Sequence, residues 1–265
     1  MTFEPLHGKQ QTERQTAPLS PPGPVCLPPD HSALPNRSPV DVTVSIIIPV
    51  WREQERITPL LQHLAQLDPA ISREIIVVDG DPGGSTLAAI TNSQVCGMLA
   101  PKGRGQQLAT GATAASGDII LLLHADTLLP DNALSSVLQA VQQGATWGAF
   151  RLGIAATGPA YRLLERSVDL RCKLFSLPYG DQAVFVQRTV LADLGGIPPI
   201  PLMEDVELAR RLVRAHQRFV LLPHRVCTSA RRWQRDGILL RSLKNLLLLF
   251  SYLTGTSPKK LANRY

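Results

Sequence analysis

Charged side chains follow directly after three runs of apolar residues in this sequence. The charged residues are Arg52, Glu53, Asp79, Asp81 and Asp126. A carboxylate can bind Mg2+ or Mn2+, and such an ion or a guanidinium can neutralise the charge of a diphosphate. If the apolar runs are parallel strands of one sheet, these side chains lie along one edge of it and could form a single active site.

Two common motifs for binding phosphate are absent from the sequence. The first apolar run is followed by Pro49-Val50-Trp51-Arg52-Glu53 instead of G-x-G-x-x-G, and there is no P-loop. A diphosphate would therefore have to be held by a metal-binding carboxylate together with basic side chains. Asp126 could supply the carboxylate and Arg104 the positive charge, although an aspartate after a strand also commonly caps a helix or forms a turn.

Strands and helices alternate along the middle of the chain. Apolar runs predict strands at 42–48, 75–78, 95–99 and 118–123, with Pro49 ending the first. Apolar residues at helical spacing predict helices at about 57–67, 105–115 and 130–143, the first of which can accommodate Pro59 only in its first turn. This order predicts βαβ units and a parallel sheet, whose ligand site lies at the carboxyl ends of the strands.

The charge of the 265-residue chain is unevenly distributed. Residues 206–265 contain 13 basic and 2 acidic residues, a net charge of +11, whereas residues 1–205 have a net charge of −5. This asymmetry favours an anionic ligand or surface near the C-terminal part and disfavours a nucleic-acid-binding protein that is basic all over. Residues 1–40 hold nine of the 22 prolines and little apolar periodicity, which predicts a disordered leader.

The cysteines and apolar segments point to a cytoplasmic protein. The four cysteines are far apart and have no spacing suited to zinc, so we expect neither a zinc site nor a disulfide framework. No secretory signal pattern follows Met1, and no apolar run approaches the ~20 residues that cross a bilayer.

Four segments resemble, in order, the motifs of family 2 glycosyltransferases with the GT-A fold. They are residues 44–50, 74–80, 122–127 and 203–208. The resemblance runs from about Val44 to the C-terminus and is closest to a bacterial subfamily with His-Ala-Asp in place of Asp-x-Asp. That subfamily also has Gly-Arg-Gly before the preceding helix, as at residues 103–105 here. The resemblance implies an α/β fold with a Rossmann-like, mostly parallel sheet flanked by helices.

The resemblance implies a binding site for a nucleotide-sugar donor. Pro49 and Glu53 match the nucleotide-binding segment after the first strand, and Asp79 matches the acidic residue that contacts the base. Asp126 matches the carboxylate that binds Mg2+ or Mn2+ on the diphosphate. His124 replaces the other carboxylate of that motif, which makes it a second candidate ligand in a weaker metal site.

The resemblance also implies a catalytic base for an inverting displacement at the anomeric carbon. Asp205, beside Glu204, matches the aspartate that deprotonates the acceptor hydroxyl. A sugar hydroxyl is a poor nucleophile, and general-base assistance contributes ~10²- to 10⁴-fold. The same two acids could instead only stabilise the N-terminus of the helix that follows.

Several further residues keep two interpretations at this point. Asp81 lies in the loop that contacts the base, where relatives more often have Gly-Ser. Gly180, Asp181 and Gln182 could form an acceptor loop or an ordinary tight turn. Arg232 and Trp233 could contact the diphosphate or belong to a basic turn. His224 could be a metal ligand or a structural histidine.

The C-terminal segment 238–253 predicts an amphipathic helix. Leu239, Leu243, Leu246, Phe250 and Leu253 share one side. The opposite side holds Arg241, Lys244, Asn245 and Ser251. The helix could pack its apolar side on the sheet, or it could lie in the interface of an anionic membrane.

Taken together, the sequence predicts a disordered leader (1–40), a GT-A domain (41–235) and an amphipathic basic extension (236–265). We expect a metal-dependent inverting glycosyltransferase that moves a sugar from a nucleoside-diphosphate sugar to a hydroxyl acceptor, with a lipid as one candidate acceptor. Its expected location is the cytoplasm, with peripheral contact to the inner face of the cell membrane as a further option. The alternatives are a sugar-nucleotide-binding protein without turnover and a nucleotidyltransferase, although the Gly-rich basic loop of the latter is missing after the first strand.

Overall fold

Eight strands form one mixed sheet in the computed structural model, which describes residues 42–263. The strands are β1 (Val44–Val50), β2 (Arg73–Asp79), β3 (Val95–Leu99), β4 (Ile119–Leu122), β5 (Thr127–Leu128), β6 (Trp147–Ile154), β7 (Phe185–Gln187) and β8 (Phe219–Thr228). Their order across the sheet is β3-β2-β1-β4-β7-β6-β8-β5. The predicted leader at 1–40 lies outside the described residues.

The sheet has a parallel part and a mixed part. Strands β3, β2, β1 and β4 are parallel neighbours, as the alternation of strands and helices predicted. Strand β7 pairs antiparallel with both β4 and β6, while β6 and β8 are parallel. The carboxyl ends of β1, β2 and β4 therefore meet at one edge of the sheet, where the site residues were expected.

Strand β1 does not end at Pro49, as the sequence had suggested. It continues to Val50, and Pro49 pairs in register with Val78 of β2. On its other side β1 pairs with β4 only as far as Ile47 and Leu122. Pro49, which has no backbone N–H, thus lies beyond the part of the strand that is paired on both sides.

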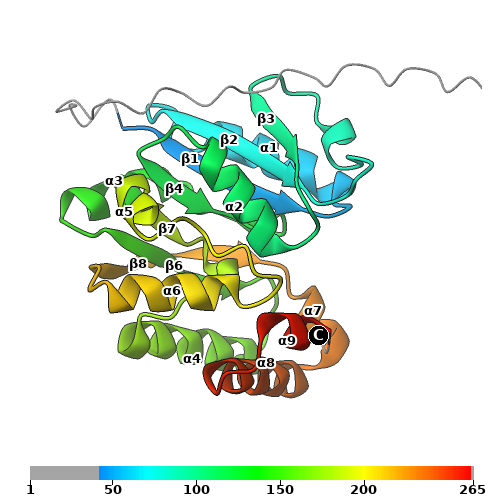
Figure 1. The fold of residues 1–265 in the computed structure, drawn as a ribbon, viewed down its shortest axis with the longest axis vertical. Helices are drawn as coiled ribbons and strands as arrows, with labels where there is room; N and C mark the ends of the chain where they lie inside the picture. The colour runs from blue at the N-terminus through cyan, green and yellow to red at the C-terminus, as the bar shows by residue number, and fades with distance from the viewer. Residues whose placement is uncertain (1–41, 264–265) are drawn as a thin grey trace, which may run out of the picture.

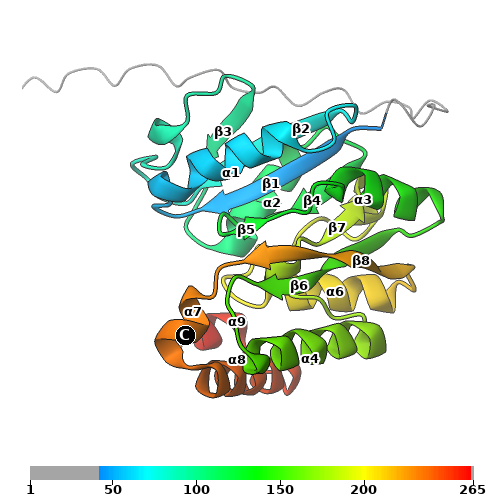
Figure 2. The same cartoon turned by 180° about the vertical axis from the view of Figure 1, so that it is seen from behind.

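Helices cover both faces of the sheet (Figures 1 and 2). They are α1 (Gln54–Gln66), α2 (Arg104–Ala114), α3 (Ala133–Gln142), α4 (Pro159–Phe175), α5 (Arg188–Asp193), α6 (Glu204–Arg214), α7 (Arg231–Asp236), α8 (Ile238–Leu253) and α9 (Pro258–Ala262). The expectation that Pro59 lies in the first turn of its helix was wrong. It is the sixth residue of α1, on the exposed side of the helix.

The core has two layers because neighbouring residues of a strand point to opposite faces. Ile46 and Ile48 of β1 pack with α1 and α3, whereas Ile47 packs with α2 and α6. Both layers hold fully buried aliphatic side chains, so the strand ends that carry the site are firmly positioned.

Helix α8 has the predicted bounds, and of the two arrangements considered for it, packing of its apolar side on the sheet is not observed. Its apolar side is exposed, with Leu239 at 86% and Phe250 at 65% of full exposure. Arg241, expected on a solvated polar side, is only 8% exposed. No helix within residues 42–263 is long and apolar enough to cross a membrane.

Candidate active site

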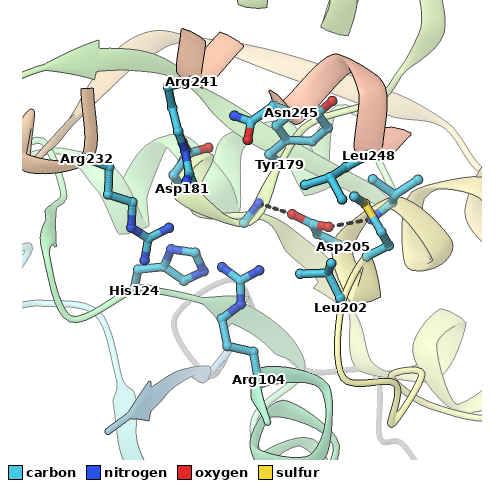
Figure 3. A pocket seen from close by; sticks show the side chains of 13 residues that line it. Arg104, His124, Tyr179, Asp181, Leu202, Asp205, Arg232, Arg241, Asn245 and Leu248 are labelled. Atoms are coloured by element: carbon cyan, nitrogen blue, oxygen red, sulfur yellow. Dashed lines mark hydrogen bonds between the residues drawn. The ribbon is translucent and has the colours of Figure 1, made fainter. Parts of the chain in front are cut away.

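A cavity lies beyond the carboxyl end of β4, between the parallel part of the sheet and the C-terminal helices (Figure 3). Its lining residues come from segments far apart in the sequence. They are Arg104, His124, Tyr179, Gly180, Asp181, Leu202, Met203, Asp205, Val206, Arg232, Arg241, Asn245 and Leu248. Among the residues predicted from the sequence, the cavity thus brings together Arg104, His124, Gly180, Asp181, Asp205 and Arg232.

Asp205 is held in the first turn of α6. One carboxylate oxygen, Oδ2, accepts the backbone N–H of Gly180 at 2.8 Å, and the other accepts the N–H of Val206 at 2.7 Å. Met203, just before the helix, has φ of 67°, an uncommon value for a non-glycine residue. The carboxylate is therefore positioned by backbone groups and faces a cavity, while it also complements the positive end of the helix.

Gly180 allows the loop after α4 to approach the end of β4. A Cβ atom at this position would lie 2.7 Å from Nε2 of His124 and 3.6 Å from Oδ2 of Asp205. Real side chains do not tolerate the shorter distance without movement. Glycine is thus required here if the imidazole and the carboxylate are to face the same cavity.

The His124 imidazole is held neutral by its surroundings. Burial lowers its pKa well below the ordinary value, and the guanidinium groups of Arg104 and Arg232 lower it further. An uncharged imidazole keeps a lone pair on one ring nitrogen, which a metal ion or a hydrogen-bond donor can use.

Arg104 and Glu204 form an ion pair beside the cavity, 2.8 Å between Nε and Oε1, in which Arg104 is partly exposed and Glu204 is buried. Glu204 is 2% exposed, and its Oε2 has no hydrogen-bond partner. Burial raises the pKa of Glu204 to about 7, although Arg104 acts to lower it, and the same pairing raises the pKa of Arg104. A carboxyl group this deeply buried is suited to orienting Arg104, whereas Asp205 is the carboxylate that faces the cavity.

The Glu204 side chain should make protein stability depend on pH. Between its ordinary pKa of 4.5 and about 7, the unfolded chain has lost a proton that the folded chain retains. The free energy of unfolding should therefore fall as pH rises, by up to ~1.4 kcal/mol per pH unit from this group. We expect Glu204→Gln to gain stability relative to the wild type from pH 5 to pH 8, as measured by urea denaturation.

Glu207 provides the control for this experiment. It lies one turn along the same helix, but hydrogen bonds from Tyr252 and Arg211 and the charges of nearby arginines outweigh its burial and lower its pKa. Glu207→Gln should change the pH slope only below about pH 4.5, because the wild-type group is ionised in both states above that value. Identical slopes for wild type and Glu204→Gln above pH 5 would contradict the assignment.

The residues predicted to bind the nucleotide form a separate rim beyond β1 and β2. The buried Asp79 carboxylate accepts the N–H groups of Asp81 and Thr86, both at 2.9 Å. Thr86 in turn accepts the N–H of Glu53 at 3.0 Å. Asp81 lies 3.9 Å from Arg52, and its pKa is lowered, chiefly by the neighbouring Ser85 and also by Arg52. In this arrangement Asp79 shapes the loop, and Asp81 is the more accessible acid.

Gln107 also shapes this rim, although no sequence signal singled it out. It lies on α2, is 3% exposed, and its amide nitrogen donates to the carbonyl groups of Val50 at 2.6 Å and Val78 at 2.8 Å. The helix thereby joins the ends of β1 and β2. A lone glutamine in a helical segment has no motif, which is why only the structure reveals it.

The glycines on either side of Arg104 explain the Gly-Arg-Gly pattern. Gly103 has φ of 136°, which strongly favours glycine. A Cβ on Gly105 would lie 2.2 Å from the carbonyl oxygen of Ile200, so the segment before α6 can lie directly against α2. This close approach places Arg104 next to Glu204.

Two predicted contact residues lie away from the cavity. Gln182 is fully buried, donates to the Phe150 carbonyl at 3.0 Å and accepts the N–H of Tyr179 at 3.2 Å. Trp233 packs against the apolar cluster that contains Ile154. Gln182 thus anchors the loop that carries Gly180 and Asp181, and Trp233 anchors α7, instead of touching a ligand in this cavity.

Asp126 and His124 are the two predicted metal ligands. Among residues 42–263, no three His, Cys, Asp or Glu side chains converge on one point. His224 lies elsewhere and contacts the Asn132 amide at 3.0 Å. His124 lines the cavity and Asp126 lies outside its lining. By their chemistry a neutral imidazole and one carboxylate would suit a Mg2+ or Mn2+ ion that takes its other ligands from a phosphorylated substrate, because Mg2+ is commonly bound by one or two carboxylates plus phosphate oxygens.

The C-terminal helix supplies cavity residues that were not predicted to be there. Arg241, Asn245 and Leu248 all line the cavity from α8 (Figure 3), and Arg241 pairs with Asp236 at 3.4 Å. Burial lowers the pKa of Arg241 and the nearby Arg232 lowers it further. Asp181, which also lines the cavity, has its pKa raised by burial. Helical periodicity identified the two sides of α8 but not which one the protein covers.

Comparison with known proteins finds relatives that are named for sugar transfer. A family model described as glycosyl transferase family 2 matches residues 45–192. An undecaprenyl-phosphate 4-deoxy-4-formamido-L-arabinose transferase from Aeromonas hydrophila is 31% identical over 111 residues, which are 38% of this chain and 34% of that protein. A dolichol-phosphate mannosyltransferase from Pyrococcus furiosus is 27% identical over 107 residues, 38% and 30% of the two chains. The matches thus span about a third of the length of these relatives.

Solved structures show the same fold. The mannosyltransferase PcManGT from Pyrobaculum calidifontis, in complex with GDP-Man and Mn2+, has a TM-score of 0.62 at 19% identity, covering 83% of this chain and 67% of that one. TarS 1–349 from S. aureus, in complex with UDP-GlcNAc, has a TM-score of 0.55 at 15% identity, covering 71% and 58%. The mostly parallel, helix-flanked sheet predicted from the sequence is confirmed as GT-A-like.

Proposed function

The chain belongs to glycosyl transferase family 2, and we propose that it moves a sugar from a nucleoside-diphosphate sugar to an acceptor hydroxyl with inversion at the anomeric carbon. The observation that carries this proposal is the Asp205 carboxylate, held by the Gly180 N–H at 2.8 Å, in one cavity with Arg104 and Arg232. The cavity combines a base for the acceptor with cations for the departing diphosphate.

In the proposed reaction Asp205 accepts the acceptor hydroxyl proton as that oxygen attacks the anomeric carbon. The bond from this carbon to the diphosphate breaks, and its electron pair leaves with the nucleoside diphosphate. Arg104 and Arg232 stabilise the charge that develops on the leaving group. Glu204 orients Arg104 through their 2.8 Å ion pair. A neutral His124 adds no positive charge and donates or accepts a single hydrogen bond on each nitrogen.

We propose that Asp126 and His124 hold a Mg2+ or Mn2+ ion together with the donor diphosphate. The ion, when bound, neutralises the diphosphate and makes it a better leaving group. Asp81, with Glu53 and the loop shaped by Asp79, then receives the nucleoside at the rim of β1 and β2. The Mn2+ and GDP-Man in the PcManGT structure are consistent with such a site.

Asp126→Asn should weaken metal-dependent nucleotide binding. Mutating a residue that only hydrogen-bonds to a metal ligand typically lowers metal affinity ~10- to 100-fold. Losing a direct ligand should therefore lower the affinity for the metal by at least about that factor. Calorimetry with GDP and UDP, with and without Mn2+, should show that Mn2+ no longer raises affinity in the variant. Asp131→Asn, an exposed aspartate five residues on, is the matched control. Equal affinities with and without Mn2+ in the wild type would contradict the metal site.

We propose further that the acceptor is a lipid or lipid-linked, and that the enzyme meets it as a peripheral protein at the inner face of the cell membrane. Two relatives are named for transfer to undecaprenyl phosphate and dolichol phosphate. The basic C-terminal part, with a net charge of +11, also suits an anionic surface.

Product analysis tests the transferase proposal directly. The protein is incubated with a panel of nucleotide sugars and bacterial lipid extract, and products are identified by mass spectrometry. We expect one donor to yield a lipid heavier by one sugar residue, together with free nucleoside diphosphate, and Asp205→Asn to yield neither. Nucleotide-sugar binding without any transfer would favour a binding protein, and release of sugar 1-phosphate instead of nucleoside diphosphate would favour a nucleotidyltransferase.

A further inference from the structure

Exposed apolar side chains are concentrated on two helices. Of the fourteen exposed large apolar residues among the described ones, eleven lie on α4 and α8. They are Leu163, Leu170, Leu174 and Phe175 on α4, and Leu239, Leu240, Leu243, Leu246, Leu247, Phe250 and Leu253 on α8. Both helices lie at the same end of the molecule (Figures 1 and 2). We call these eleven side chains the end face.

The end face is distinct from the packed sides of the two helices. The opposite side of α4 is packed, because Val168 and Cys172 contact the apolar residues of β6. The opposite side of α8 lines the cavity through Arg241 and Leu248. Each helix is thus partnered on one side and apolar on the other. Monomeric proteins rarely expose a large contiguous apolar patch unless it is an interaction site.

The exposed charges on α4 and α8 are all positive. Arg166, Lys173 and Lys244 are exposed, and Lys259 and Lys260 follow on α9. The acidic residues of α4, Glu165 and Asp169, turn inward and pair with Arg225, at 3.9 and 2.9 Å. Cations beside a broad Leu/Phe surface are the pattern of helices that lie in an anionic membrane interface.

We propose that the end face, formed by α4 and α8 together, binds the membrane surface, with anionic lipid as its partner. The α4 half is essential to this proposal, because a tail helix alone would leave Leu163, Leu170, Leu174 and Phe175 in water. A second copy of the chain fits less well as the partner, because lysine is depleted in protein–protein interfaces. Basic residues near an anionic surface each strengthen binding to it, which favours the lipid.

The position of α8 connects this face to the active site. One side of the helix carries the apolar residues of the end face, and the other carries Arg241, Asn245 and Leu248 in the cavity wall. When the end face is bound to the membrane, the cavity would therefore lie within one helix diameter, ~10 Å, of the lipid surface. This part of the inference rests on the proposed function, since it makes a lipid-linked acceptor reach Asp205 along α8.

Vesicle flotation tests membrane binding by the end face without requiring turnover. The wild type should float with vesicles of phosphatidylcholine and phosphatidylglycerol. The floated fraction should rise with the proportion of phosphatidylglycerol, the anionic lipid, and fall as the salt concentration rises. Leu170→Ser/Leu174→Ser on α4 and Leu243→Ser/Leu247→Ser on α8 should each reduce the floated fraction at least tenfold. Leu99→Ser/Leu128→Ser removes two exposed leucines from strands instead, and should float like the wild type.

Charge and oligomeric state complete the test. Lys173→Glu/Lys244→Glu should abolish the dependence on phosphatidylglycerol, and melting temperatures should confirm that all variants are folded. Flotation of the α4 variant like the wild type would overturn the two-helix face. A wild-type dimer in sedimentation that the α4 variant breaks, without vesicle binding, would assign the face to a second copy. Because flotation needs no donor, vesicle binding without sugar transfer would overturn only the proposed function.

Discussion

Replacing Asp205 by asparagine should lower kcat by ~10²- to 10⁴-fold, the usual contribution of a general base. Asparagine has nearly the same shape, and its oxygen can still accept the Gly180 N–H. The loop and the cavity should therefore keep their geometry, so that nucleotide binding and the melting temperature stay close to those of the wild type. The measurement is turnover with the donor and acceptor found by product analysis, next to calorimetry with the nucleoside diphosphate.

Asp193→Asn is the matched control, because this aspartate is exposed at the end of α5 and faces no cavity residue of the site. Its kcat should equal that of the wild type. If Asp205→Asn also keeps kcat within a few-fold, the attacking oxygen needs no base. That result would indicate an acceptor that is already ionised, such as a phosphate oxygen, instead of a hydroxyl.

Gly180→Ala should cost both activity and stability. Its Cβ would lie 2.7 Å from His124 Nε2, so either the imidazole or the loop must move. Overpacking of this kind costs ~1 to 3 kcal/mol of folding free energy. Displacing the loop also lengthens the hydrogen bond from the Gly180 N–H to Asp205, and a misplacement of about 1 Å can cost ~10²-fold in rate.

A double variant separates the steric effect from other effects of alanine. His124→Ala/Gly180→Ala removes the atom that the new Cβ would meet. If the clash is the cause, the double variant should recover most of the stability lost in Gly180→Ala, as measured by urea denaturation. Equal losses in the single and double variants would mean that the backbone itself rejects a side chain here.

The parallel part of the sheet could be predicted from the sequence because its strands are separated by helices. Runs such as 75–78 and 95–99 are short, apolar and bounded by turn residues, and β3 was predicted with its observed bounds. The mixed part could not be predicted in the same way. Strand β7 has three residues and β5 has two, which is too short to leave an alternating pattern.

The sequence predicted the site residues that belong to motifs, but not those whose position depends on how the helices and loops pack. Asp205, His124 and Arg104 were expected from their motifs, and the structure brings them to one cavity. Gln182 belonged to the predicted acceptor loop, but its amide bonds inward. Arg241 was expected at a surface, because periodicity gives the angle between residues around a helix without saying which side meets the protein.

The ion pair between Arg104 and Glu204 also bears on how substrate preferences could change in this family. The residues proposed to bind the nucleoside and the metal all precede residue 130, whereas the candidate acceptor loop and Asp205 follow residue 178, so a point between residues 130 and 178 separates the two groups. Recombination between homologous genes near that point would exchange the acceptor side while leaving the nucleotide side intact. A viable chimera would need to retain the arginine and the glutamate together, because the buried Glu204 carboxylate would otherwise lose the guanidinium that pairs with it.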